Sequence, residues 1–346
     1  MILILNQLFL CIHKKVFLLT LLLMQLFALA YSPNAVAQAI NPANYPTNYP
    51  TKQIQFIVPF PPGGPADVQA RIVGQKLSAR WKQPVIIDNR PGAGGSIGAE
   101  FVARAPADGY TFLYTTSGPI SVNPIFSNSS FDPLKNLSSV ILTSTLSSVM
   151  VVNPSLNIKS INELIQYAKE NPGKLNYASS GNGSTSHLSM EQFNRLAGVQ
   201  ITRIPYKGAS PAINDLLGGN VQVMLMGLTS VLPFLESGKL TAIGVSSLKP
   251  SPLAPKIPTI ASSGLNGFEA SNWLGVFAPP NTPVDIVNKM NAEIYAIMKL
   301  PDVKERLFKE GFEPMPTYTP TQFKDFIQKD IAKWSKIIKE SNITTD

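Results

Sequence analysis

Cysteine and histidine are scarce in this chain of 346 residues, which contains one cysteine, Cys11, and two histidines, His13 and His187. With one thiol and two imidazoles, the chain cannot build a disulfide framework, and a zinc site is implausible. A Ser-His-Asp hydrolase would need a nucleophile elbow such as Gly-x-Ser-x-Gly, and we expect none in this chain, since the serine-containing segment at residues 181–184 does not have that spacing. We therefore expect no catalytic residue, no metal and no cofactor.

Charged residues are also few, since they make up 14% of the chain, against 44% hydrophobic residues. This balance is typical of a globular protein with a core and excludes a disordered chain. The net charge of +8 could indicate nucleic acid, but the basic residues neither cluster nor alternate with aromatic ones. A phosphate-binding Gly-Lys-Ser/Thr loop is absent, and residues 92–98 fail the dinucleotide pattern because Ile97 replaces the third glycine. We expect no nucleic-acid partner, and the positive charge favours an acidic ligand or a nearby anionic membrane.

Long apolar runs are confined to the N-terminus, where residues 1–37 have the three parts of a secretion signal. Lys14 and Lys15 form a positive start, residues 16–30 form an apolar centre, and residues 35–37 (Ala-Val-Ala) match a cleavage site. A second apolar run, at residues 1–12, precedes the lysines. The alternative is an uncleaved membrane anchor, but neither residues 1–12 nor residues 16–30 reach the roughly 20 residues that a span needs. Cleavage would remove the one cysteine and two of the 29 basic residues, leaving 27 against 21 acidic residues and a net charge of +6.

The segment at residues 54–71 combines an apolar run, a turn and a helix start. Residues 54–58 predict a buried strand, residues 61–64 (Pro-Pro-Gly-Gly) predict a turn, and Pro65 suits the first position of a helix. Free backbone N–H groups and the positive end of the helix dipole would then point at one spot, which suits an anion. An ordinary loop between a strand and a helix is the alternative interpretation.

A second segment of the same design lies at residues 175–197. A predicted strand at residues 175–178 leads into a loop of small polar residues, and a predicted helix follows. The hydroxyls of this loop, Asn182 and the backbone N–H groups could together bind a carboxylate through neutral hydrogen bonds. The alternative is a helix that caps its own N-terminus, although one cap needs fewer polar side chains. We expect His187 to cap this loop or to pack locally rather than to react.

Strands and helices alternate along the chain at a spacing that predicts a parallel α/β fold. A ligand crevice is then expected beyond the carboxyl ends of the strands, where residues 60–64 and 116–121 lie. Three side chains have competing interpretations. Asp67 is expected to interact favourably with the dipole of its helix, and the alternatives are that it fixes bound water or binds a ligand amine. Arg90 is expected to pair with a carboxylate, and Trp273 to pack in the core or to line a cleft.

Several motifs rich in glycine and proline run through the chain: Pro-Phe-Pro-Pro-Gly-Gly-Pro-Ala-Asp (59–67), Asp-Asn-Arg-Pro-Gly-Ala-Gly-Gly-Ser-Ile-Gly (88–98), Asn-Pro-Gly-Lys-Leu-Asn-Tyr-Ala-Ser-Ser-Gly-Asn-Gly (171–183) and Pro-Tyr-Lys-Gly (205–208). Together they resemble the Bug receptors, the TctC-type solute-binding proteins of tripartite tricarboxylate transporters. The likeness extends over residues 51–343. It implies an α/β fold of the type II periplasmic-binding-protein kind, in which two lobes joined by two crossing strands hold a ligand between them.

The resemblance also implies limits for the parts of the chain. Residues 1–37 would be the signal peptide and residues 38–51 an N-terminal tether. Residues 52–145 and 246–346 would form the first lobe, and residues 146–245 the second lobe.

In the family, two glycine loops clamp a small carboxylate, partly through ordered water, and a third loop contributes. Matched to this chain, the resemblance implies the following ligand-binding residues: Phe60, Pro62, Gly63, Gly64, Asp67, Thr116, Ser117, Ser180, Asn182, Gly183, Ser184, Thr185 and Met226. The implied function is that of a monomeric periplasmic receptor without enzymatic activity, secreted through a cleaved signal peptide. It would capture a small organic carboxylate and deliver it to the permease subunits of a tripartite tricarboxylate-type transporter. The alternatives are a partner that presents its ligand to a membrane kinase and a periplasmic hydrolase on the same scaffold.

The chain departs from the family pattern at residues 221–227, which are Val-Gln-Val-Met-Leu-Met-Gly. Family members often have Val-Asp-Val-Met-Phe-Asp-Asn here, so Met226 and Gly227 replace an aspartate and an asparagine. If this strand end faces the cleft, the site loses an acceptor and gains an apolar, adaptable surface. We then expect a ligand with an apolar or aromatic body rather than an amine.

Overall fold

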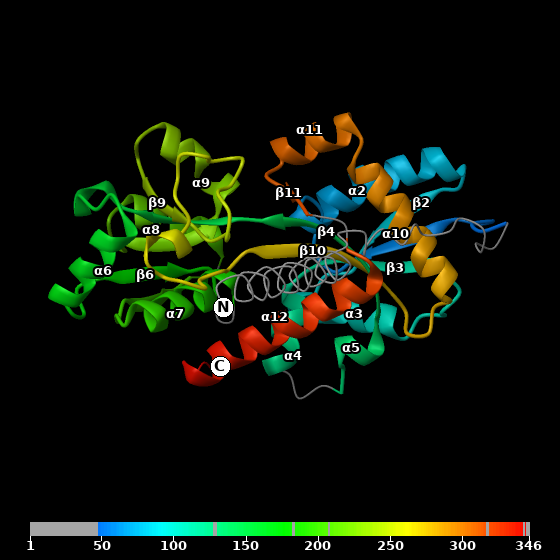
Figure 1. The fold of residues 1–346 in the computed structure, drawn as a ribbon, viewed down its shortest axis with the longest axis horizontal. Coiled ribbons are helices and arrows are strands. Elements are labelled where there is room, and N and C mark those ends of the chain that lie inside the picture. Colours follow the sequence, from blue (N-terminus) through cyan, green and yellow to red (C-terminus); the bar gives the residue numbers. More distant parts are fainter. Residues whose placement is uncertain are drawn as a thin grey trace, which may run out of the picture. The chain divides into compact units, whose positions relative to one another are not determined.

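The computed structural model describes residues 48–126, 130–181, 184–206, 208–315, 318–341 and 343. The predicted signal peptide (1–37) and most of the predicted tether (38–51) fall outside these residues. Residues 45–346 form one compact unit, which contains two β-sheets with helices packed around them (Figure 1). No helix among the described residues is long and apolar enough to cross a membrane.

The first sheet has six strands in the order β11-β4-β10-β3-β1-β2. Strand β1 runs parallel to β2 and β3, as predicted, whereas β10 is antiparallel to both β3 and β4. The loops that follow β1 and β3 therefore start from the same end of the sheet, where the carboxyl ends of these strands lie. In chain order, the strands are β1 (Ile54–Val58), β2 (Val85–Asn89), β3 (Thr111–Thr116), β4 (Ser138–Leu146), β10 (Asn272–Ala278) and β11 (Glu313–Pro314).

Helix α2 (Pro65–Trp81) follows β1 and begins where the sequence predicts. Pro65 occupies its first turn, and the extended Gly64 precedes it. Its buried side chains, among them Ile72 and Leu77, pack in one core with the strands of the first sheet. Further helices precede β4 or follow β10: α3 (Ser96–Ala103), α4 (Asn123–Phe126), α5 (Pro133–Asn136), α10 (Val284–Met298) and α11 (Pro301–Lys309). Single helical turns lie at η2 (Ala93–Gly95), η3 (Gly118–Val122), η4 (Pro154–Leu156) and η5 (Ala261–Ser263).

The second sheet has five strands in the order β7-β6-β8-β5-β9. Strand β6 is parallel to β7 and β8, and each of these three strands leads into a helix. The helices α7, α8 and α9 consequently begin at the same end of the sheet, beyond the carboxyl ends of these strands. The strands are β5 (Ser148–Val152), β6 (Asn176–Ser179), β7 (Thr202–Pro205), β8 (Val223–Gly227) and β9 (Thr241–Val245), and the helices are α6 (Ile161–Glu170), α7 (Thr185–Ala197), α8 (Ala209–Leu217) and α9 (Leu228–Glu236).

The chain crosses from one sheet to the other twice. On the first pass, a single residue, Ser147, separates β4 of the first sheet from β5 of the second. On the second pass, residues 246–271 lead from β9 to β10, and Phe268 of this segment packs in the core of the second sheet. Helix α12 (Pro320–Glu340) packs against both sheets. Phe323 is buried in a second core cluster of the first sheet, and Trp334 is buried in the core of the second sheet.

The lobe limits predicted from the resemblance, with the second lobe at residues 146–245, stay a prediction. We propose that the second lobe also includes residues 260–270 and the end of α12, because both contribute side chains to its core.

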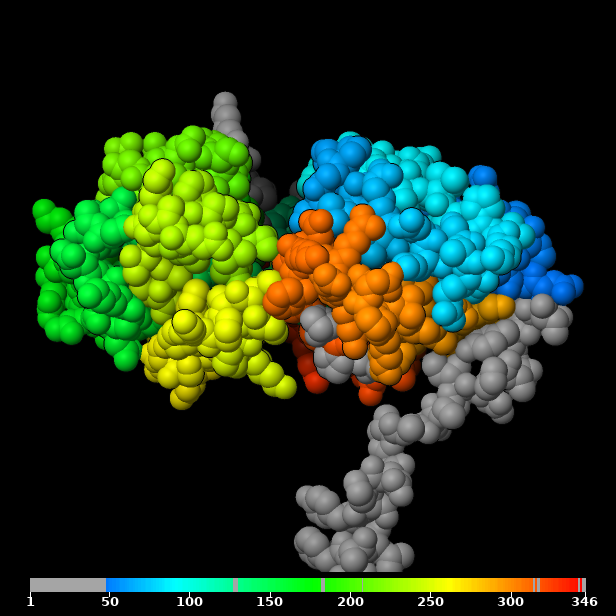
Figure 2. Space-filling view, turned by 90° about the horizontal axis from the view of Figure 1, so that it is seen from above, coloured from blue at the N-terminus to red at the C-terminus, as the bar shows by residue number. Residues whose placement is uncertain are grey.

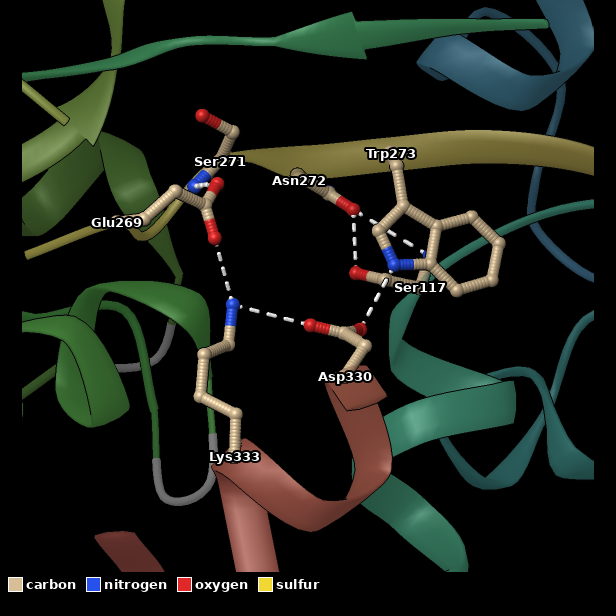
Figure 3. Close-up of polar contacts among 7 residues, drawn as sticks. All are labelled: Ser117, Glu269, Ser271, Asn272, Trp273, Asp330 and Lys333. Atoms are coloured by element: carbon tan, nitrogen blue, oxygen red, sulfur yellow. Dashed lines mark hydrogen bonds and ion pairs between the residues drawn. The ribbon is translucent and has the colours of Figure 1, made fainter. Parts of the chain in front are cut away.

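The sequence pattern does not predict strands β4 and β10, which pair with each other. Strand β10 meets α12 at a polar network (Figure 3). Trp273 of β10 is 1% exposed, and its Nε1 donates a hydrogen bond to Asp330 Oδ2 of α12 (2.8 Å). Of the two roles considered for Trp273, core packing is therefore the one that the structure has. Lys333 Nζ lies 3.0 Å from Asp330 Oδ1 and 2.7 Å from Glu269 Oε2. The network ties α12 to the segment through which the chain returns to the first sheet.

Candidate ligand-binding site

A cavity of about 360 Å³ lies between loops of the first sheet and loops of the second sheet. Figure 2 shows these parts from above, with residues of the first sheet's part in blue and orange and those of the second in green and yellow. The described lining residues come from at least six segments: Gly63, Pro65, Val68, Leu146, Ser147, Ser148, Ser180, Thr185, Ser186, Ala209, Met224, Leu225, Met226, Gly227, Leu228, Thr229, Ser230, Asn272, Glu310, Gly311 and Phe312.

Four helices begin at this cavity, because the lining includes the first residues of α2, α7, α8 and α9, namely Pro65, Thr185, Ala209 and Leu228. The helices have 17, 13, 9 and 9 residues, so each carries a substantial dipole. Leu228 N donates to Ser147 O, and His187 N donates to Ser184 Oγ. The positive helix ends and the remaining first-turn N–H groups favour an anion in the cavity. Sequence reasoning expects two of these helix starts at a ligand, and the parallel pairing of β6, β7 and β8 adds the other two.

Formal charge is scarce on the cavity wall. Among the described lining residues, Glu310 is the charged one, and lysine, arginine and histidine do not occur. Polar lining is supplied mainly by hydroxyl groups, and apolar lining by the side chains of Met224, Leu225, Met226, Leu228 and Phe312. An anion held by these described residues would therefore receive neutral hydrogen bonds and helix dipoles rather than an ion pair.

Asp67 orders the loop between β1 and α2. Its side chain is 2% exposed, and its carboxylate accepts hydrogen bonds from Gly63 N, Arg71 Nε and Asn89 Nδ2, each at 2.9 Å. Burial by itself would raise the pKa of Asp67, but the hydrogen bonds from Arg71, Gly63 and Asn89 hold this pKa below its usual value. Because Gly63 N already donates to Asp67, it is not one of the N–H groups free for a ligand in this structure.

Apart from Gly63, the predicted residues of the first and third loops are not among the described residues that line the cavity. Phe60 packs against the first core, and its carbonyl accepts a hydrogen bond from Asn89 Nδ2 (3.0 Å). Ser117 Oγ donates to Asn272 Oδ1 (2.6 Å), so Ser117 orients a side chain that does line the cavity. None of Phe60, Pro62, Gly64, Asp67, Thr116 and Ser117 is among the described lining residues.

The second loop combines both interpretations that its sequence allows. Ser184 is the N-cap of α7, because its Oγ accepts a hydrogen bond from His187 N (3.3 Å). Ser180 and Thr185 line the cavity, and Ser186 Oγ accepts a hydrogen bond from Ser180 N (2.9 Å). One serine thus caps the helix while its neighbours face the cavity. The predicted residues Asn182 and Gly183 lie outside the described residues.

His187 packs locally, as expected. It is buried, and Arg203 Nη1 lies 3.4 Å from its Nε2. Burial, together with the guanidinium of Arg203, lowers the pKa of His187 to about 4, so the ring is neutral at pH 7.

The expectation that the chain contains no Gly-x-Ser-x-Gly segment is wrong, because residues 94–98 are Gly-Gly-Ser-Ile-Gly. The contacts of Ser96 decide whether this segment is a nucleophile elbow. Ser96 is the first residue of α3, and its Oγ accepts a hydrogen bond from Asn123 Nδ2 (3.2 Å). A serine nucleophile would need a histidine base within hydrogen-bond distance of its Oγ, whereas the described partner of Ser96 Oγ is an asparagine.

Arg90, expected to pair with a carboxylate, does so, because its Nε lies 2.7 Å from Asp88 Oδ2.

Met226 lies at the end of β8 and lines the cavity, with 6% of its surface exposed. The condition for the predicted apolar surface, that this strand end faces the cleft, is therefore met.

Ser147, Asn272, Thr229 and Glu310 line the cavity and were not predicted from the sequence. Ser147 stands out because its hydroxyl is buried and has no hydrogen-bond partner among the described residues. Leaving a buried hydroxyl unpaired costs about 1–3 kcal/mol. Sequence carries no signal for these four, because each reaches the cavity through contacts with distant parts of the chain.

Known proteins resemble this chain in sequence, and solved structures resemble it in fold. BugT from Bordetella pertussis is 37% identical over 292 residues, which are 84% of this chain and 89% of BugT. A solved structure described as R. palustris Rpa4515 with adipate is 36% identical, with a TM-score of 0.73, and covers 86% of this chain and 99% of its own. MatC from Rhodopseudomonas palustris with bound malate is 31% identical, with a TM-score of 0.69, and covers 84% of this chain and 100% of its own.

These likenesses establish the fold that the resemblance implies. Another similar structure, with 32% identity and a TM-score of 0.70, is the periplasmic binding protein BugD. Residues 69–343 match the family described as "Tripartite tricarboxylate transporter family receptor". The chain therefore has the fold of two-lobed periplasmic binding proteins and belongs to the TctC family of tripartite tricarboxylate transporter receptors.

Proposed function

We propose that this protein is a receptor that binds the carboxylate of a small organic acid in the cavity between its two sheets. The convergence of four helix N-termini on one cavity carries the proposal. Helix dipoles favour an anion there, and the N–H groups of the first turns can donate to it. Two similar structures, described with adipate and with malate, support a carboxylate as the anion.

In this proposal, the hydroxyls of Ser180 and Thr185 donate to the ligand directly, and Asn182 and Gly183 also contact it. Since Ser117 donates to Asn272 Oδ1, the –NH₂ group is the part of Asn272 that can serve the ligand. The remaining predicted residues shape and order the loops: Phe60, Pro62, Gly63, Gly64, Asp67, Thr116 and Ser117 in one part, and Ser184 in the other.

The body of the ligand is proposed to be apolar. Met226, Leu228 and Phe312 line the cavity, and Met226 stands where family members often have an aspartate. A methionine adapts its shape to an alkyl chain or a ring, but it cannot accept a hydrogen bond well from an ammonium group. Tight binding of aspartate or glutamate, with no affinity for hexanoate or benzoate, would contradict this part of the proposal.

The proposal extends to transport. We infer that the chain is exported to the periplasm, loses its signal peptide and acts there as a monomer, passing the acid to a tripartite tricarboxylate-type permease. Membership in a receptor family supports binding without turnover. Pull-down of detergent-solubilised membranes with the acid-loaded protein should retain permease subunits. Capture of a membrane kinase would favour a sensing role, and steady conversion of the bound compound would favour a hydrolase.

A thermal-shift screen tests the binding step. Adipate, malate, hexanoate and benzoate are added to the purified protein, with glucose as a neutral control. A ligand that binds the folded state raises the Tm by mass action. A rise with glucose and with none of the acids would overturn the proposal.

A pair of variants tests whether the ligand is an anion bound at this cavity, since each variant adds one carboxylate but only one of them adds it to the cavity wall. Thr185→Asp puts a carboxylate at the first residue of α7, where the helix dipole tolerates it, but where it faces the cavity. We expect affinity for the acids to fall about tenfold or more through charge repulsion. Asn162→Asp makes the same kind of change in the first turn of α6, away from the described lining, and should leave affinity within about twofold.

A further inference from the structure

Ser147 is the one residue between β4 and β5, where the chain passes from the first sheet to the second. It lines the cavity together with its neighbours Leu146 and Ser148. Its carbonyl oxygen accepts a hydrogen bond from the backbone N of Leu228, the first residue of α9 (3.1 Å). The backbone of Ser147 is thus held by both parts of the molecule, while no described contact uses its hydroxyl.

The Ser147 hydroxyl differs from buried hydroxyls near it. The residue is 3% exposed, and its Oγ is shielded and has no hydrogen-bond partner among the described residues. By contrast, Ser144 Oγ accepts from Gln69 Nε2 (2.7 Å), and Ser246 Oγ accepts from Ser148 N (3.0 Å). Native proteins pair nearly all of their buried polar groups, so the unpaired hydroxyl is unusual. Because Ser147 itself lines the cavity, rotation of its side chain about χ1 would turn this shielded hydroxyl toward a partner in the cavity.

We propose that Ser147 is a ligand-binding residue whose hydroxyl forms a hydrogen bond with an oxygen of the bound organic acid. The inference rests on the proposed function and adds to it a residue that neither the sequence pattern nor the family motifs single out. A serine hydroxyl both donates and accepts, so it suits a carboxylate oxygen or a hydroxyl group of the acid. Because Ser147 joins β4 to β5, the acid would contact the connection between the sheets as well as the loops of each.

The test compares Ser147→Ala with Ser189→Ala by isothermal titration. Ser189 lies on α7 and also has a buried, unpaired hydroxyl, but it is not among the described lining residues, so it is a matched control. The probe is whichever of adipate, malate, hexanoate and benzoate binds the unmodified protein most tightly. We expect Ser147→Ala to bind it about tenfold more weakly, which is 1.4 kcal/mol, and Ser189→Ala to bind it within twofold of the unmodified protein.

Neither variant should lower the Tm of the free protein, because each removes a hydroxyl that makes no internal hydrogen bond. Should Ser147→Ala fail to fold, Ser147→Cys keeps the size of the side chain with a much weaker hydrogen-bonding group, and it should also weaken binding several-fold. If the unmodified protein binds none of the four acids, the proposed function fails, and this inference fails with it. If an acid binds and Ser147→Ala matches Ser189→Ala within twofold, the hydroxyl serves only a trapped water, and this inference alone is overturned.

Discussion

Gly311, in the turn after α11, lies against Thr229, the second residue of α9, and both residues line the cavity. A Cβ at Gly311 would collide with the methyl group of Thr229. Gly311 leads into β11 of the first sheet, whereas Thr229 follows β8 of the second. The part of the molecule around the first sheet therefore contacts the part around the second sheet at the cavity, as well as where the chain crosses from one sheet to the other. Because Gly311 has no side chain, the two parts can come this close.

Gly311→Ala should weaken the binding of an organic acid by about tenfold, because the new methyl group pushes apart the two parts that enclose the ligand. Titration of the acid into the variant measures this loss. Adding Thr229→Ala to Gly311→Ala should restore most of the affinity, since it removes the methyl group that collides. A double-mutant cycle then gives a coupling of about 1 kcal/mol between positions 229 and 311.

A substitution at a second glycine serves as the control for backbone strain. Gly311 has a φ of +85° and Gly267 one of +81°, but nothing lies within 4 Å of a Cβ built at Gly267. Alanine at either position costs about 1–2 kcal/mol of stability through the left-handed backbone. Gly267→Ala should therefore lower the Tm without lowering affinity. Equal affinity in the two glycine variants would show that the contact with Thr229 does not matter for binding.

Asp67→Asn should lower the free energy of unfolding by about 1–3 kcal/mol at pH 7, because a buried carboxylate with three hydrogen-bond donors loses its charge. The pKa of Asp67 in the folded protein lies below the usual value of 3.8, so the carboxylate stabilises the fold fully above about pH 5. That contribution is lost as the pH falls below 3.8 through the folded-state pKa.

Urea denaturation at a series of pH values measures this difference. The gap between the unmodified protein and Asp67→Asn should be largest near neutral pH and should shrink as the pH falls below 3.8. Asp325→Asn, at an exposed position of α12, serves as the control and should change stability by less than about 0.5 kcal/mol. A gap that widens in acid would refute the assignment to Asp67.

Lys333→Met should destabilise the protein by about 2–4 kcal/mol. The substitution leaves Asp330 and Glu269 without their shared cation, and breaking a buried ion pair by removing one partner is costly. The expected cost is below that of a fully buried pair, since 25% of the Lys333 side chain is exposed. Thermal unfolding measures it. Lys336→Met on the same helix is the control, because that lysine is 66% exposed and should cost less than about 0.5 kcal/mol.

Met226→Ala should weaken the binding of hexanoate about three- to tenfold, because apolar surface that would cover the alkyl chain is lost. Malate, whose body is short and polar, should keep its affinity within about twofold and so serves as the internal control. Competition titrations with both acids measure the ratio. An equal loss for both acids would mean that Met226 supports the fold of the loop and does not contact the ligand body.

Local elements followed from the sequence because their signals are local. Pro65 at the start of α2 and the glycines before it predict the first loop within a few residues, and the apolar run before them predicts β1. Strands β4 and β10 escaped prediction, since their place in the sheet depends on pairing with each other and with β3 across long stretches of chain.

The candidate site was predicted only where its residues belong to such local loops. Gly63, Ser180 and Thr185 were named in advance and line the cavity, as does Met226. Asp67 was expected near the ligand, but its carboxylate is used within the loop, because Arg71 lies one helical turn further on and Asn89 at the end of a paired strand.

By itself, the sequence determined the alternating strands and helices and the two glycine loops, because strand periodicity, proline, glycine and short polar motifs act over a few residues. The TctC kind of receptor followed from the resemblance of its motifs to that family. Only the tertiary structure decided that four helix starts share one cavity, that the Ser147 hydroxyl is left unpaired on its wall, and that Gly311 must meet Thr229. These relationships join residues far apart in the chain, and their energies come from burial and close packing that exist only after the strands have paired.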